Sequence, residues 1–263
     1  MKFQIFGLLF TLLILSSCSK KQQDDDSPYS SSYKVVSVTN GGTIKGTVKT
    51  DPSAKFAANI ETQKDEDVCG ESHRNLSAPN SNGTVPNCII GIEHITSGKD
   101  FSKHEYTFDQ NGCDFHPHIQ IVNLGSTIIF SNSDKVLHNY HINRNGETVI
   151  NEAQPEGAPP REVILKQTGL HIVTCDVHPW MKGYIWMAEN PYYTMSDSTG
   201  AFTLSDVPPG KYKLILWRDN WNVEGVKNAN GNIESYQWEK DFSKEQEITV
   251  EAGKDVVVDF MLP

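Results

Sequence analysis

Short runs of alternating apolar and polar residues recur along most of the chain, and turn residues separate them. A period of two is typical of β-strands with one buried face. The clearest runs predict strands at residues 43–48, 88–92, 118–122, 127–130, 171–174, 212–216 and 255–260. No segment shows a sustained helical period, and no tandem repeat stands out. The pattern therefore predicts an all-β protein.

The N-terminus departs from this pattern. Met1-Lys2 precedes an apolar run over residues 3–15, which is shorter than the roughly 20 apolar residues of a transmembrane helix and fits an export signal. The run ends in Leu15-Ser16-Ser17-Cys18, which resembles the lipobox of bacterial lipoproteins. The resemblance implies removal of residues 1–17, acylation of Cys18, and an extracytoplasmic protein held by lipid at the periplasmic face or the cell surface of the outer membrane. The alternative is an ordinary signal peptide with an incidental cysteine.

Residues 18–33 contain too few apolar side chains to pack, and we interpret them as a flexible tether. The aspartate run at 24–26 either resembles a surface-export signal of lipoproteins or belongs to a solvated linker. The net charge of the whole chain is −10 at pH 7, and removal of the leader takes away one further lysine. This balance argues against nucleic acid and anionic membrane surfaces as partners.

A concentration of metal-binding side chains directly follows the predicted strand at 171–174. Cys175, His178 and Met181 place a thiolate, an imidazole and a thioether on one loop. Soft sulfur together with imidazole selects copper, and two nitrogens, a thiolate and a weak axial thioether define a blue-copper (type 1) electron-transfer site. The second imidazole must come from elsewhere, and the candidate is His138, just beyond the strand at 127–130. The sequence therefore predicts one type 1 copper.

Residues 104–189 resemble the cupredoxin family, most closely its amicyanin/plastocyanin branch. The matching motifs are the strand opening Pro117 to Gly125, the run from Asn132 to His138-Asn139, and the loop Cys175-x-x-His178-x-x-Met181. The resemblance implies a Greek-key β-sandwich and copper ligation by His138, Cys175, His178 and Met181. It also implies that Asn139 ties the two ligand loops together.

The same resemblance implies a route for electrons. In the family the electron leaves through the partly exposed edge of the C-terminal histidine, here His178. Pro179 and Trp180 would lie in the surrounding apolar patch, where a redox protein such as a cytochrome c or a dehydrogenase docks over a small interface. The alternative for Trp180 is a loop-packing role.

Three further histidines are candidates for a second metal site. His116 and His118 would share one face of a strand, and His141 follows His138 by three residues. Imidazole pairs bind copper or zinc, although such residues more often lie on the surface or in the core. Cupredoxins of this type also carry a histidine at the His141 position that is not a ligand.

Three cysteines remain after lipid and copper have taken Cys18 and Cys175. Cys88 shares a predicted strand face with Ile90 and Ile92, which places its thiol in the core. Cys69 and Cys113 each adjoin a glycine at a turn-like position. We therefore predict a Cys69–Cys113 disulfide, although the sequence alone allows three pairings.

The C-terminal part resembles the carboxypeptidase regulatory-like (transthyretin-like) sandwich in its Asp197-x-x-Gly200-x-Phe202 and Pro209-Gly210-x-Tyr212 motifs. That family opens with two strands that are missing directly before Ser196, whereas similar strands occur at 42–48 and 85–90. We hypothesise that residues 34–102 and 190–263 are the two halves of one sandwich, with the cupredoxin (103–189) inserted between them. Three consecutive modules are the alternative.

These features favour a non-enzymatic carrier of single electrons. A copper oxidase or nitrite reductase needs a second copper with its own histidines, and a binuclear electron-transfer site needs a second loop cysteine; neither is present. The alternative is a surface-anchored lipoprotein that binds carbohydrate or protein, with copper binding or storage as a secondary property. A copper chaperone would more often expose its ligands on a mobile segment.

Overall fold

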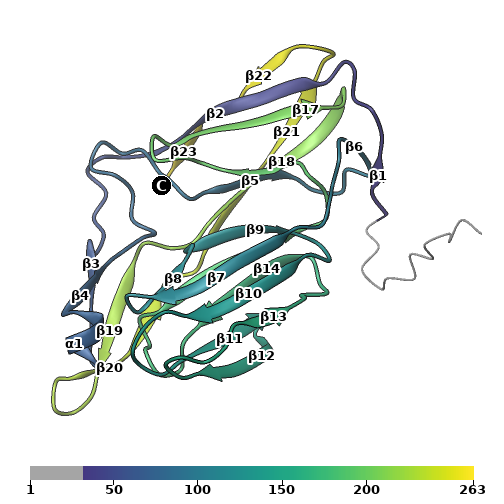
Figure 1. Cartoon of the computed structure of the whole chain (residues 1–263). Helices are drawn as coiled ribbons and strands as arrows, with labels where there is room; N and C mark the ends of the chain where they lie inside the picture. Colours follow the sequence, from purple (N-terminus) through teal and green to yellow (C-terminus); the bar gives the residue numbers. More distant parts are fainter. Residues whose placement is uncertain (1–31) are drawn as a thin grey trace, which may run out of the picture.

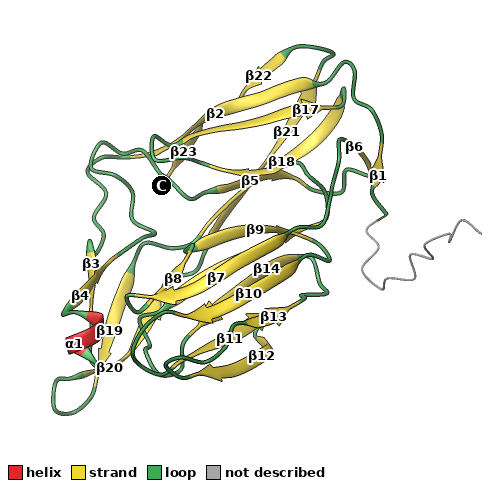
Figure 2. Cartoon of the chain, in the orientation of Figure 1, coloured by secondary structure: helices red, strands yellow, loops and turns green. Residues whose placement is uncertain are grey.

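The computed structural model describes residues 32–263, so the predicted leader, Cys18 and most of the tether lie outside the described residues. The regular secondary structure of the described part is almost entirely β-strand, with one short helix, α1 (Glu66–Cys69) (Figure 2). The predicted all-β fold class is therefore confirmed. Within residues 32–263, no helix has the length and apolar character needed to cross a bilayer.

The central part of the chain forms a two-sheet sandwich, called here the middle sandwich (Figure 1). One sheet has the order β13-β10-β7-β8, from Arg161–Val163, Thr127–Asn132, Glu105–Asn111 and Asp114–His116. The other has the order β12-β11-β14-β15-β9, from Glu147–Gln154, His138–Arg144, Gly169–Thr174, Lys182–Ala188 and Ile119–Asn123. Aromatic rings fill the space between the sheets. The ring of Phe130 stacks on that of Tyr140 with 4.3 Å between the ring centres, and its centre lies 5.4 Å from that of Phe108.

The flanking sandwich is built from both ends of the described chain. Its first sheet has the order β16-β5-β18-β21, from Tyr193–Met195, Ile89–Ile92, Gly210–Arg218 and Phe242–Val250. In its second sheet β2 (Gly42–Thr50) pairs with β17 (Ala201–Val207), β22 (Asp255–Val257) and β23 (Phe260–Leu262). Strands that precede the middle sandwich thus pair with strands that follow it. That the two parts also fold as one cooperative unit stays a prediction.

The strand expected at 255–260 is interrupted. Val258 lies between β22 and β23, and its amide donates to the Lys45 carbonyl while Asp259 accepts from the amide and hydroxyl of Thr47. Gly46 permits this approach, because a Cβ there would lie 1.8 Å from the Val258 oxygen. The close backbone contact explains why the pairing shifts at this point.

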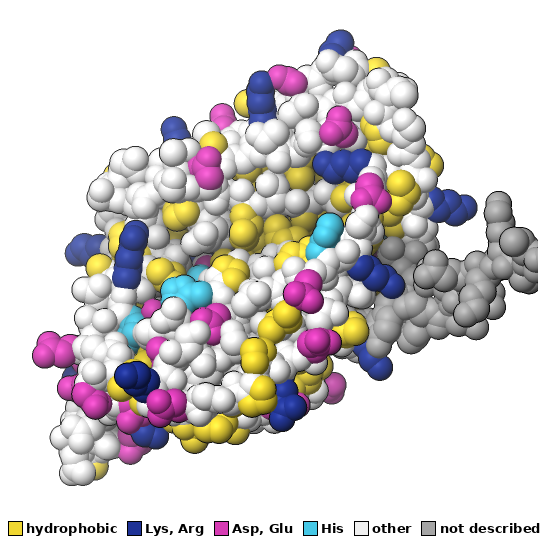
Figure 3. Space-filling model, viewed as in Figure 1, with side chains coloured by type: hydrophobic (Ala, Val, Ile, Leu, Met, Phe, Trp, Pro, Cys, Tyr) yellow, Lys and Arg dark blue, Asp and Glu magenta, His cyan; other side chains and the backbone are white. Residues whose placement is uncertain are grey.

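The two sandwiches lie one above the other in Figure 1. They pack against each other through apolar side chains. The junction cluster joins Ile89, Ile215 and Trp217 of the flanking sandwich to Ile119, Tyr184, Trp186 and Ala188 of the middle sandwich. The ring of Trp217 lies 5.1 Å from that of Tyr184. In Figure 3 hydrophobic side chains are visible along this junction. A shared apolar interface of this kind resists relative movement of the two sandwiches.

Two excursions from the flanking sandwich reach one end of the middle sandwich, at the left of Figure 1. The first, called here the cap, comprises residues 59–74 with β3 (Asn59–Glu61), α1 and β4 (Ser72–Arg74). The second is the hairpin of β19 (Val223–Lys227) and β20 (Ile233–Trp238). Near the opposite end, β1 (Lys34–Val35) pairs with β6 (Ser97–Gly98). Ile60 and Cys69 of the cap are buried in the same apolar cluster as the core of the middle sandwich.

Candidate metal centre

The predicted copper ligands come from two places in the middle sandwich. His138 begins β11, whereas Cys175, His178 and Met181 lie on the turn between β14 and β15. This turn is closed by its own backbone, because the Cys175 amide donates to the Met181 carbonyl and the Met181 amide donates to the His178 carbonyl. Pairing of β11 with β14 brings His138 to the same end of the sheet.

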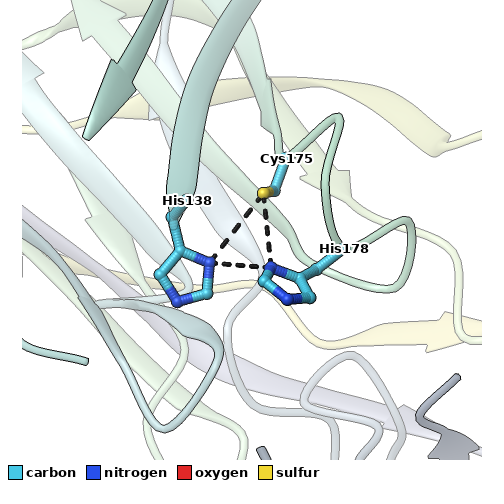
Figure 4. A group of neighbouring side chains, drawn as sticks. All are labelled: His138, Cys175 and His178. Atoms are coloured by element: carbon cyan, nitrogen blue, oxygen red, sulfur yellow. Dashed lines mark hydrogen bonds between the residues drawn. The ribbon is translucent and has the colours of Figure 1, made fainter. Parts of the chain in front are cut away.

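The side chains of His138, Cys175 and His178 converge (Figure 4). The Cys175 Sγ lies 3.9 Å from Nδ1 of His138 and 3.7 Å from Nδ1 of His178, and the two Nδ1 atoms are 2.8 Å apart. All three residues are buried, and Met181 on the same turn is fully buried as well. One sulfur and two imidazole nitrogens therefore face a common point, which is the donor set that copper prefers.

The outer nitrogens of both imidazoles face carboxylates. Nε2 of His138 lies 2.9 Å from Asp134 Oδ2, and Nε2 of His178 lies 3.0 Å from Asp65 Oδ2. An ionised carboxylate only accepts hydrogen bonds, so this network assigns the proton of each ring to Nε2. Two unprotonated Nδ1 atoms then point at each other.

Such facing lone pairs repel each other, and a cation between them would relieve the repulsion. Burial lowers the pKa of His138, and the hydrogen bond to Asp134 opposes this effect only in part. The pKa of His178 is also lowered, first by burial and further by the neighbouring His138, against the hydrogen bond to Asp65. Because protonation is disfavoured at both rings, the arrangement fits a bound metal ion better than a bound proton.

Burial also raises the pKa of the Cys175 thiol, and hydrogen bonds at Asn139, His178 and Val177 counteract this only partly. Without metal, this residue therefore holds its proton at neutral pH. Since the thiolate is the form that binds metals, binding of a metal ion here would release that proton.

Asn139 connects the two parts of the site. Its Oδ1 accepts a hydrogen bond of 2.7 Å from the Asp176 amide and lies 3.4 Å from the Cys175 Sγ. Its Nδ2 donates to Asp176 Oδ2 and to Asn151 Oδ1. The residue next to one ligand thus fixes the backbone next to another, as the sequence resemblance implied for this position.

Two carboxylates at the site were not predicted from the sequence. Asp134 accepts from Nε2 of His138 and from the amides of Gly112 and Cys113, in the turn between β7 and β8. Its position inside the Asn132–His138 motif was a usable signal. Asp65 belongs to the cap and is 113 residues from His178 in sequence, so no local pattern indicated it.

The structure joins Cys69 to Cys113 in a disulfide, and Cys88 is a free, buried thiol. The bridge connects α1 of the cap to the turn between β7 and β8. Burial raises the pKa of the Cys88 thiol to about 12. Cys88 is therefore a core residue without thiolate character at neutral pH.

The expected exposed electron-transfer edge is not found. His178 is 0% exposed and Trp180 is 2% exposed, while Pro179 is only half-buried. The Trp180 ring lies between the rings of His178 (4.9 Å) and His73 (5.8 Å), and its Nε1 donates to the Cys113 carbonyl. The prediction was wrong because the cap packs over this end of the middle sandwich, where Asp65 contacts His178 and the His73 ring lies against that of Trp180.

The three other candidate histidines do not form a second site. His116 contacts the Asn111 carbonyl, His118 contacts Asp219 and Ser77, and His141 contacts Asp176 and Thr148. Among the described residues, none of the three belongs to a group of converging metal ligands. The predicted second metal site is therefore wrong, because each imidazole forms hydrogen bonds with different partners.

A family model described as Polysaccharide lyase family 4, domain II matches residues 167–258. This match includes β14 and β15 of the middle sandwich with the turn between them, and it continues through most of the C-terminal part of the flanking sandwich. No curated protein matches the chain.

The chain is similar to several solved copper proteins. It matches the Cu-containing nitrite reductase (NirK) from Thermus scotoductus SA-01 at 20% identity and a TM-score of 0.31, over 35% of this chain and 24% of that chain. The purple cupredoxin from Nitrosopumilus maritimus matches at 19% identity and a TM-score of 0.29, over 32% of this chain and 99% of that chain. A variant of amicyanin in the reduced Cu(I) form matches at 16% identity and a TM-score of 0.30, over 33% of this chain and 85% of that chain.

Proposed function

We propose that this protein is an extracytoplasmic type 1 copper protein that carries single electrons between redox proteins. The observation that carries the proposal is the convergence of His138 Nδ1, His178 Nδ1 and Cys175 Sγ inside a rigid β-sandwich. Bound copper would supply a one-electron couple. His138, Cys175 and His178 would hold it, and the thioether of Met181 would be a weaker fourth donor.

The chain's own residues limit the reorganisation that accompanies electron transfer. Asp134, Asp65 and Asn139 fix the ligand side chains from outside, so little has to move when the charge changes. Among the described residues the other converging group contains Cys113, which the disulfide already occupies. This single complete ligand set supports a carrier in preference to an enzyme.

We further propose lipid anchoring through Cys18 to a bacterial membrane, and a cytochrome c or a dehydrogenase as the exchange partner. A second candidate function is a surface-anchored lipoprotein that binds carbohydrate, with copper binding or storage secondary. The match of residues 167–258 to a domain of a polysaccharide lyase family favours that candidate. Binding of oligosaccharides by a protein that remains colourless with copper would support it.

The decisive experiment is the visible and EPR spectrum of the copper-loaded soluble protein beginning near Ser30. We expect an intense blue thiolate-to-copper absorption, which Cys175→Ser abolishes. Cys88→Ser is the matched control, because Cys88 lies in the core of the flanking sandwich and should leave the colour unchanged. A wild-type protein that binds copper and stays colourless contradicts the type 1 assignment.

A further inference from the structure

The cap contributes directly to the surroundings of a predicted copper ligand. Asp65 lies at the start of α1, and its Oδ2 is 3.0 Å from Nε2 of His178. Its backbone has a φ of 54° and a ψ of 37°, in the left-handed region that non-glycine residues rarely adopt. The Asp65 carbonyl accepts from the amides of Val68 and Cys69, so the turn that presents this carboxylate is itself fixed.

The same cap is linked to the other imidazole through the disulfide. Cys69 in α1 is bonded to Cys113, and the Cys113 amide donates to Asp134 Oδ2. That oxygen also accepts from Nε2 of His138 at 2.9 Å. The disulfide therefore stands at the meeting point of both outer contacts, one through Asp65 and one through Asp134.

We propose that the cap is a working part of the copper centre, in which Asp65 is the positioning residue of His178 and the Cys69–Cys113 disulfide keeps it in place. The inference rests on the proposed copper site. The carboxylate holds the proton of His178 on Nε2, which leaves Nδ1 free to bind the metal. Its negative charge, half-buried beside the ligand, stabilises Cu(II) more than Cu(I) and so lowers the reduction potential.

The cap also closes the usual access to the metal. His178 is fully buried, and Trp180 is packed between His178 and His73 of β4. A partner therefore meets the surface of the cap before it meets the C-terminal ligand. Copper should accordingly be lost slowly, and electron exchange should depend on whether the cap is held shut.

The test compares Asp65→Asn with Asp67→Asn in the copper-loaded protein. Asparagine preserves size and tolerates a positive φ, and Asp67 is an exposed carboxylate on the same helix. We expect Asp65→Asn to lose copper to a chelator about 10-fold faster or more. Its reduction potential should rise by about 59 mV for each tenfold decrease in the affinity for Cu(II) relative to that for Cu(I). Asp67→Asn should match the wild type in both measurements.

A second readout does not depend on copper. The ¹⁵N imidazole spectrum of the metal-free protein reports the tautomer of His178. We expect the Nε2-protonated form in the wild type and a mixture of tautomers in Asp65→Gly. Glycine is chosen because it readily adopts the positive φ of position 65. Removing the disulfide by Cys69→Ser with Cys113→Ser should speed oxidation of the Cu(I) protein by ferricyanide. An unchanged tautomer in Asp65→Gly together with a wild-type potential in Asp65→Asn overturns the proposal. A colourless wild type that shows the expected tautomer change contradicts the type 1 site alone.

Discussion

Nε2 of His118 in the middle sandwich lies 2.9 Å from Oδ2 of Asp219 in the flanking sandwich. The Ser77 hydroxyl contacts both groups, and Asp219 and Ser77 are buried. One carboxylate therefore joins three segments that are distant in sequence. Together with the apolar cluster around Trp217, this contact couples the two sandwiches.

Asp219→Ala should lower the free energy of unfolding by about 1–3 kcal/mol, because the buried Ser77 hydroxyl and the half-buried His118 ring lose their partner. Urea denaturation of the metal-free protein measures this. Asp255→Ala is the control, since Asp255 forms an exposed ion pair with Lys45 that contributes at most about 1 kcal/mol. Equal losses in the two variants would show that the junction contact is not stabilising.

Met181→Leu should keep the blue colour and raise the reduction potential. Leucine fills a similar volume at this fully buried position but offers no sulfur, so Cu(II) loses a weak donor that it uses more than Cu(I) does. Optical spectra and a redox titration against the wild type decide. A variant with an unchanged potential would remove Met181 from the ligand set.

Replacing residues 103–189 by a short Gly/Ser linker should leave a flanking sandwich that still unfolds cooperatively. The reason is that β2 and β5 pair with β17, β16 and β18 across the deleted segment. Ile89, Ile215 and Trp217 would become exposed, so we expect lower solubility than in the whole protein. Residues 190–263 alone should not fold; if they do, the insertion hypothesis is wrong.

The metal-free protein should lose stability as the pH falls below about 6.5, and His171 should account for part of the loss. Burial lowers the pKa of His171 in the folded state. A hydrogen bond from the ring to the Gly169 carbonyl opposes this shift, whereas the charge of nearby Arg144 lowers the pKa further. The unfolded chain therefore binds this proton first, and stability declines with falling pH by at most about 1.4 kcal/mol per pH unit for this group.

Urea denaturation between pH 5 and 8 tests this in the wild type and in His171→Gln. Both proteins contain the same other histidines, so the difference between their pH profiles isolates His171. We expect the two profiles to run parallel above pH 7 and the wild-type profile to fall more steeply below 6.5. Parallel profiles over the whole range would contradict the prediction.

Local patterns in the sequence predicted the strands and part of the site well. The alternating runs at 118–122 and 127–130 coincide with β9 and β10, and the fixed spacing of Cys175, His178 and Met181 placed three potential ligands on one turn. The resemblance to cupredoxins, carried by motifs of a few residues each, also implied the role of Asn139 beside His138. Such features depend on neighbours within a few residues, which is the range over which periodicity and spacing carry information.

By itself the sequence determined the all-β fold class and the residue types that converge as metal donors. Only the tertiary structure decided what surrounds them. Asp65 reaches His178 across 113 residues, and Asp219 reaches His118 across 101. The exposed edge expected for His178 was wrong for the same reason, since the cap that buries it belongs to a separate part of the chain. Contacts of this kind follow from how whole sheets pack, and no periodic or spacing pattern within either segment records its partner.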